Sequence, residues 1–218
     1  MTEPILLSRL HFPVDNLGYG SRAGIWFQGC TIYCRGCISR DTWTFDPATR
    51  TDVEAVLAWL RRLDGQVDGV TISGGEPTDQ PEALLGLLAG IAEWRGDSEI
   101  DVLMYSGRSA DTLRHGLPWL WESVDILISE PYEASRAAGC ALRGSDNQRV
   151  NLLTELARRR YPAESLESTY APQRTKIGVH VDLESIWLVG LPHHGDLPKL
   201  RDHLTERGVE LGRTSWLT

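Results

Sequence analysis

The sequence has no long apolar run and almost no lysine. The absence of 18 consecutive apolar residues excludes a conventional membrane-spanning helix. All but two of the 22 basic residues are arginine, the exceptions being Lys176 and Lys199. The 30 acidic residues give a net charge of −8, which argues against a broad nucleic-acid-binding surface. The amino terminus lacks the basic flank and apolar stretch of a signal peptide, so we expect a cytoplasmic protein.

Cysteine is scarce too, with four residues in a chain of 218, which is too few for a disulfide scaffold. Three of them, Cys30, Cys34 and Cys37, lie within eight residues. Such a cluster in a cytosolic protein indicates a metal site before a disulfide. Thiolates are the usual ligands of iron–sulfur clusters, and three of them leave one iron of a [4Fe–4S] cluster open to another ligand. The alternatives are purely structural cysteines or a zinc site, with a fourth ligand from Cys140, His180 or His193.

Apolar runs alternate with helical patterns along most of the chain, which predicts an α/β fold. A helix follows each predicted strand, so the strands should form a parallel sheet with right-handed crossovers. We expect strands at 23–28, 69–73, 100–105 and 124–128, and helices at 52–64, 81–94, 109–116 and 147–160.

The loops that follow these strands carry the most distinctive residues. Ligands of parallel sheets bind at the carboxyl ends of the strands. Four loops should therefore meet at one edge of the sheet, namely 30–37, 74–77, 106–108 and 129–132.

The last quarter of the chain has a different pattern. We expect a core over 1–160 and an extension over 161–218 packed on that core as part of a single domain. Within the extension, 176–181 and 185–190 should form a hairpin and 196–207 a helix, whereas 161–175 has no clear period. Because exposed apolar strands aggregate, we expect the hairpin to pair with the edge of the main sheet rather than cover the mouth of the fold.

The motif Cys-x3-Cys-x2-Cys, followed after the next strand by Ser73-Gly74-Gly75-Glu76-Pro77, resembles the signature of radical S-adenosylmethionine (SAM) enzymes. Residues 27–30, 34–37, 42–43, 105–107 and 142–149 resemble the activating-enzyme branch, and the chain is similar to activases of anaerobic ribonucleotide reductase over about residues 5–160. The resemblance implies an incomplete (β/α) barrel. In that branch Asp-Gly precedes a Pro–aromatic pair, where this chain has Ser129-Glu130.

The resemblance also implies a role for each residue of the site. Cys30, Cys34 and Cys37 would hold one [4Fe–4S] cluster, whose open iron would bind SAM. The expected SAM contacts come from four loops. Gly74, Gly75 and Glu76 would receive the SAM amino group, Gly36 would face the adenine, and Ser106 and Glu130 are candidates for the ribose, Ser106 also for the carboxylate. Arg143 could pair with a carboxylate. The plainer alternatives are a helix cap for Ser106 and a surface carboxylate for Glu130.

The implied reaction is reductive cleavage of SAM to methionine and a 5′-deoxyadenosyl radical, with one electron from an external donor. The expected substrate is a glycine of a partner glycyl-radical enzyme. The alternative is a stand-alone oxidoreductase that acts on a small molecule or a modified peptide. Neither interpretation involves a nucleic acid or a membrane as partner.

Overall fold

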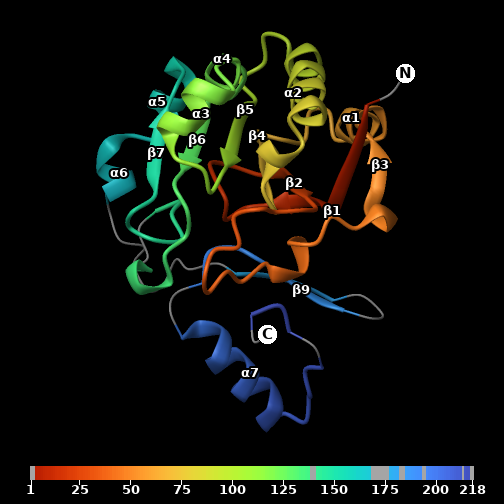
Figure 1. The fold of residues 1–218 in the computed structure, drawn as a ribbon, viewed down its shortest axis with the longest axis vertical. Coiled ribbons are helices and arrows are strands. Elements are labelled where there is room, and N and C mark those ends of the chain that lie inside the picture. The colour runs from red at the N-terminus through yellow and green to blue at the C-terminus, as the bar shows by residue number, and fades with distance from the viewer. Residues whose placement is uncertain are drawn as a thin grey trace.

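The main sheet is open and has seven strands in the order β3-β1-β2-β4-β5-β6-β7 (Figure 1). The computed structural model describes residues 3–137, 141–167, 177–181, 185–192, 195–212 and 214–216. Neighbouring pairs among β2, β4, β5 and β6 are parallel, whereas β1, β3 and β7 each run antiparallel to their neighbours. The expected α/β class with a parallel central sheet, a carboxyl-terminal hairpin and a helix is confirmed.

The strands are β1 (Pro4–Val14), β2 (Arg22–Phe27), β3 (Arg50–Asp52), β4 (Gly69–Gly74), β5 (Asp101–Tyr105), β6 (Ile126–Ser129), β7 (Arg149–Leu152), β8 (Gly178–Val181) and β9 (Ile186–Val189). The helices are α1 (Val53–Arg61), α2 (Pro81–Arg95), α3 (Ala110–Gly116), α4 (Leu120–Ser123), α5 (Glu155–Arg160), α6 (Ala163–Glu167) and α7 (Asp196–Glu206). No helix in these described ranges is long and apolar enough to cross a membrane.

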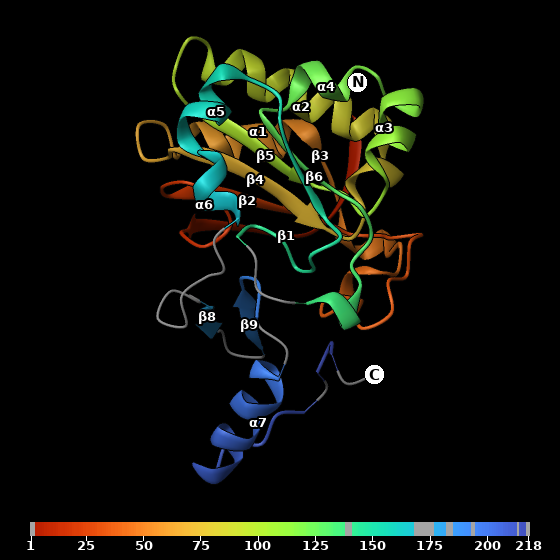
Figure 2. The ribbon, with the colours of Figure 1, turned by 90° about the vertical axis from the view of Figure 1, so that its left-hand side faces the viewer.

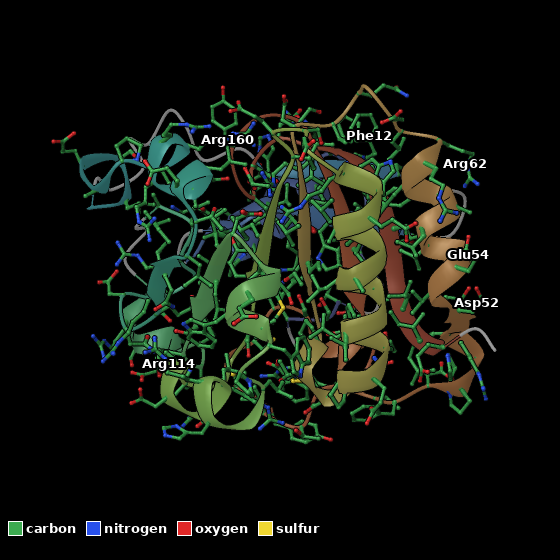
Figure 3. The ribbon with its side chains drawn as sticks, turned by 90° about the horizontal axis from the view of Figure 1, so that it is seen from above. Phe12, Asp52, Glu54, Arg62, Arg114 and Arg160 are labelled. Atoms are coloured by element: carbon green, nitrogen blue, oxygen red, sulfur yellow. The ribbon has the colours of Figure 1, made fainter. Side chains whose placement is uncertain are left out.

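Successive side chains of β2 point to opposite faces of the sheet and identify what covers each face. Ala23, Ile25 and Phe27 pack into the large core under α1 and α2, whereas Trp26 belongs to a separate cluster on the opposite face. Figure 3 looks down on the helix layer that covers the first face, with Asp52 at the start of α1. The Asp52 side chain accepts a hydrogen bond from Ala55 N and thereby caps that helix.

The second face is covered by the later part of the chain. Helices α5 and α6 cover β5 and β6 on this side, where Leu103, Ile126 and Ile128 pack with Ala157 and Tyr161. The extension lies below β1 and β2, with α7 farthest from the sheet (Figure 2).

The hairpin corrects one expectation. Strands β8 and β9 pair with each other as a separate two-stranded sheet, so the prediction that they extend the edge of the main sheet is wrong. They pack instead on its open face, where the ring centroids of His11 and His180 lie 3.8 Å apart and those of Trp26 and Trp187 lie 4.9 Å apart. Aromatic packing on a face buries more apolar surface than edge pairing, which explains the preference. The loop at 182–184 lies outside the described residues, as does most of 161–175.

The prediction of a helix over 147–160 is wrong for the first half of this range. Arg149–Leu152 form β7, which pairs with β6, and α5 begins only at Glu155, after Thr154 caps it through Ala157 N. The division into a core over 1–160 and an extension over 161–218 stays a prediction.

A buried charge network holds the amino ends of the strands, opposite the cysteine loop. Asp101 bridges Arg22 of β2 at 2.5 Å and Arg160 of α5 at 2.6 Å. The Arg22 and Asp101 side chains are fully buried, and Arg22 also donates to Thr71 Oγ1 and Val70 O. The network joins three strands to the segment that covers their second face.

Candidate functional site

Residues 28–37, here called the cysteine loop, leave the carboxyl end of β2. Its first residues are fixed by backbone hydrogen bonds, from Gly29 N to Thr42 O at 2.8 Å and from Cys30 N to Trp43 O at 3.0 Å. The Gln28 side chain donates to the carbonyls of Asp41 and Thr44 and ties the loop to the segment that follows it. The start of the loop is therefore fastened to segment 41–44.

The three cysteines of this loop are free, and none of them is exposed. Cys30 is buried, and Cys34 and Cys37 are half-buried. Burial raises the pKa of all three thiols, and the neighbouring Cys34 and Cys30 further raise that of Cys37. A bound metal would deprotonate them, since a coordinating thiol ionises outright.

Backbone N–H groups point at these sulfurs. Ser39 N donates to Cys37 Sγ at 3.4 Å, and the backbone of Tyr132 hydrogen-bonds the Cys34 thiol. Such donors stabilise thiolate ligands and tune the metal that they hold. The donor set thus fits a cluster with three protein ligands, and the loop after β6 contributes to its surroundings.

A single metal ion fits less well. Within the described ranges, no three His, Cys, Asp or Glu side chains are placed to hold one ion, which the zinc alternative requires. Cys140 and His193, two candidates for its fourth ligand, lie outside the described residues. His180, the third candidate, lies in β8, and its ring packs against that of His11 in β1.

The turn after β4 lies against the cysteine loop through two glycines. Gly74 has φ +107°, and a Cβ there would collide with the backbone of Phe27. A Cβ on Gly75 would collide with the carbonyl oxygen of Gly29 and lie 2.9 Å from Thr42 O. Hydrogen bonds from Gly75 N to Phe27 O and from Glu76 N to Gly29 O close the contact. Both positions therefore require glycine for the close approach of two backbones.

Glu76 connects this turn to the loop after β5. Its Oε1 accepts from Thr78 N at 3.1 Å, Thr78 Oγ1 at 2.6 Å and Ser106 Oγ at 2.9 Å, and its Oε2 accepts from Gly107 N at 2.8 Å. Burial raises the pKa of Glu76 more than these hydrogen bonds lower it. Four donors nearly fill the acceptor sites of one carboxylate. Glu76 and Ser106 thus position two adjacent loops, and their contacts with SAM stay predictions.

The remaining expected site residues have partners within the chain. Glu130 Oε1 accepts from Ala110 N at the start of α3, and Glu130 has φ +83°, a conformation that favours glycine. This strained residue occupies the place where the resembled branch has glycine. Arg143 Nη2 donates to Leu166 O at 2.7 Å. A Cβ on Gly36 would lie 2.7 Å from that of Ala134, so Gly36 allows the loop after β6 to approach. The roles expected for Gly36, Glu130 and Arg143 toward SAM stay predictions.

A second polar network at this edge was missed by sequence reasoning. Asp79 accepts from Thr31 N at 2.7 Å and forms an ion pair with Arg108, whose Nε donates to Thr78 Oγ1 at 3.0 Å. The Asp79 side chain is only 5% exposed, whereas the Arg108 side chain is 35% exposed, so the carboxylate is shielded and the guanidinium is in part open to solvent. The pattern that could have revealed this network in the sequence is an acid, Asp79, and an arginine, Arg108, in the loops that follow two neighbouring parallel strands. The network fixes the cysteine loop to the two loops that flank it.

The four loops expected at one edge therefore meet, and comparison with known proteins agrees with their motifs. A family model described as "4Fe-4S single cluster domain" matches residues 16–151. The anaerobic ribonucleoside-triphosphate reductase-activating protein of Pasteurella multocida is 31% identical over 157 residues, which are 66% of this chain and 96% of that protein.

A pyruvate formate-lyase-activating enzyme of Clostridium pasteurianum is 32% identical over 120 residues, so that the matched part is about half of each chain. The crystal structure of QueE from Escherichia coli aligns with 49% of this chain at 20% identity and a TM-score of 0.41, which is too slight to bear on function. The family match covers the cysteine loop, the glycine turn and the loops after β5 and β6. This chain therefore belongs to the 4Fe-4S single cluster domain family, in the activating-enzyme branch of the radical SAM superfamily, whose members are oxidoreductase-type enzymes.

Proposed function

We propose that this protein cleaves SAM reductively at a [4Fe–4S] cluster held by Cys30, Cys34 and Cys37, and abstracts a hydrogen atom from a glycine of a partner enzyme. The observation that carries the proposal is a loop with three free cysteines that packs against a glycine turn at the carboxyl edge of a parallel sheet. When bound, the cluster and SAM supply the electron transfer and the bond cleavage.

The protein's own residues position these groups. Glu76, Thr78 and Ser106 hold the loops after β4 and β5 together, and the Asp79–Arg108 pair fastens the cysteine loop to both. Rigid loops of this kind hold the reacting groups in a fixed position and restrict the entry of water.

Exposed aromatic rings beside the cysteine loop support a protein partner. Tyr33 is 55% exposed and packs edge-on against Trp43, and Phe45 is 41% exposed next to Gly29. Large aromatic side chains on a surface are typical of protein interfaces. The relatives activate a reductase and a lyase, which favours an enzyme of one of these classes as the partner.

A second candidate function is favoured by the extension. Since the hairpin lies on the open face of the sheet rather than at its edge, a large part of that face is covered. A covered face suits a small molecule or a short peptide better than a bulky protein, so a stand-alone enzyme is the alternative.

Anaerobic reconstitution tests the proposal in two stages. With dithionite as the electron donor, the loaded protein should contain about four irons and convert SAM to 5′-deoxyadenosine. Addition of a purified glycyl-radical enzyme should then give a glycyl radical by electron paramagnetic resonance. Iron loading without SAM cleavage would refute the first stage, and SAM cleavage without a glycyl radical on any such partner would favour the second candidate.

The role of Glu76 has a separate test. Glu76→Gln keeps the shape of the side chain but replaces one acceptor oxygen by a donor, so the loop after β5 should shift. SAM affinity should fall about tenfold to a hundredfold while the iron content is unchanged. Equal SAM affinity in the wild type and in Glu76→Gln would show that Glu76 does not contribute to SAM binding.

A further inference from the structure

A cavity of about 760 Å³ is lined by residues of the extension and of the sheet face formed by β1 and β2. Its walls are Arg9 and Trp26 on the sheet, segment 38–42 after the cysteine loop, the hairpin, α7 and segments 209–212 and 214–216. The volume is in the range of small-molecule sites. None of the residues expected to contact SAM lines it.

Three N–H donors of residues in this lining have no hydrogen-bond partner among the described residues. They are Arg9 Nε, Arg40 Nε and Trp216 Nε1, and all three atoms are buried. Buried donors are nearly always paired, because leaving one unpaired is costly. These three come from β1, from the segment after Cys37 and from the tail of the chain, so local strain in one element does not explain them. Their convergence on one cavity indicates an acceptor-rich ligand.

The two arginines are held in place by aromatic rings. The Arg9 guanidinium lies 4.5 Å from the ring centroid of Trp187, and that of Arg40 lies 5.5 Å from the centroid of Trp43. Stacking fixes the plane of a guanidinium and directs its donors. Of the two acids in the lining, Glu210 is exposed, whereas burial raises the pKa of Asp41 and the nearby charge of Arg9 lowers it, so the Asp41 carboxylate lies within reach of Arg9.

Apolar side chains complete the walls. Leu197, Leu200 and Leu204 of α7 line the cavity together with Trp26 and Trp187. A ligand that fills this space needs an apolar or aromatic body in addition to its acceptor atoms. Carboxylate and phosphate groups are the acceptors that arginine binds most strongly.

We propose that this cavity binds a small organic anion, whose carboxylate or phosphate oxygens accept hydrogen bonds from Arg9, Arg40 and Trp216 while its apolar body packs against Trp187 and the leucines of α7. The site goes beyond the proposed function, because it makes the extension a ligand-binding part of the protein whichever substrate the radical attacks. It shares a wall with the metal-binding region, since Ile38 and Ser39 directly follow Cys37 and Ser215 Oγ donates to Ile38 O.

Calorimetric titration of the metal-free full chain tests the proposal without any activity readout. The probes are benzoate, phenyl phosphate and neutral benzamide, which share one ring. At least one of the two anions should bind, and at least tenfold more tightly than benzamide. The two anion arms distinguish a carboxylate site from a phosphate site.

The variants are Arg9→Gln, Arg40→Gln and Trp216→Phe, and each should weaken anion binding by about tenfold or more. Trp216→Phe keeps the apolar ring and removes only the N–H donor. The matched control is Arg114→Gln, since Arg114 also stacks on a tryptophan, at 5.0 Å from Trp121, but lies on the helix layer away from the cavity (Figure 3). Circular dichroism and melting curves identify any variant that fails to fold.

Three outcomes would overturn the proposal. The first is that benzamide binds as well as the anions or that neither anion binds. The second is that Arg114→Gln reduces affinity as much as Arg9→Gln does. The third is displacement of the bound anion by SAM, which would make the cavity part of the SAM site. Loss of SAM cleavage alone would affect only the proposed function, because the titration uses protein without the cluster.

Discussion

Gly75→Ala is the most informative single substitution at the edge where the loops meet. A Cβ at this position would collide with the carbonyl oxygen of Gly29, lie 2.7 Å from the carbonyl carbon of Gly29 and lie 2.9 Å from Thr42 O. All of these atoms belong to the backbone, and none can rotate away. The cysteine loop must therefore move away from the turn after β4.

The free-energy cost follows from that movement. Overpacking of this kind costs about 1–3 kcal/mol. Weakening the hydrogen bonds from Gly75 N and Glu76 N costs about 0.5–1.5 kcal/mol each. We expect a total loss of about 2–6 kcal/mol, which lowers the melting temperature of a domain of this size by about 4–24 °C. The iron content after anaerobic reconstitution should fall as well, because the displaced loop carries the three thiols.

Gly86→Ala is the matched control in the same assays. Gly86 lies within α2, and the atom nearest to its added Cβ is the Cβ of Glu3 at 4.0 Å. Alanine in a helix interior should stabilise the protein by about 0.5–1 kcal/mol, and the iron content should be unchanged. The reasoning is refuted if Gly75→Ala melts within about 1 °C of the wild type and binds a full complement of iron, because the expected loss of about 2–6 kcal/mol would then be absent.

Three further predictions concern other parts of the chain. Replacing any one cysteine of the cysteine loop by alanine should abolish iron binding measured by iron and sulfide analysis, whereas Cys140→Ala should retain the iron; the reverse pattern would refute the ligand assignment. Asp101→Asn leaves Arg22 and Arg160 without their shared carboxylate partner. The free energy of unfolding, measured by urea denaturation, should fall by about 3–5 kcal/mol. Glu54→Gln, in an exposed pair, should leave the denaturation midpoint unchanged. Burial, His180 and Arg9 lower the pKa of His11, so its contribution to stability is present above pH 6.5 and is lost as the pH falls through the lowered pKa. His11→Phe should remove that loss of stability from melting curves measured between about pH 7.5 and 5.5. An identical pH dependence in both proteins would contradict the assignment.

The sequence predicted the central part of the fold because its strands are buried on both faces. Continuous apolar runs such as 69–73 have few other interpretations, and each ends at a loop with glycine or cysteine. Strand β1 escaped notice because Ser8, Arg9 and His11 interrupt its apolar pattern. Those residues face the extension, more than 160 positions away in the chain, so no local pattern reveals why they are tolerated.

Strand β7 shows a different limit of sequence reasoning. The apolar residues of 149–160 continue a helical period, yet the first four form a strand. The Asn151 side chain donates to Leu127 O of β6, and this cross-strand contact has no signature in local spacing. At the site, the types of residue were predictable, but the saturation of Glu76 by four donors was not, because those donors come from two loops that only the fold brings together.

The position of the tail has a practical consequence for affinity tags. Ser215 Oγ donates to Ile38 O at 2.6 Å, so the last described residues lie beside the segment that directly follows Cys37. A polyhistidine tag fused to this end would bring imidazole ligands close to the thiols and compete for iron during reconstitution. Glu3, the first described residue, lies beside the start of α1, since its carbonyl accepts a hydrogen bond from Val53 N (Figure 1). Purification handles for quantitative iron analysis therefore belong at the amino end of the chain.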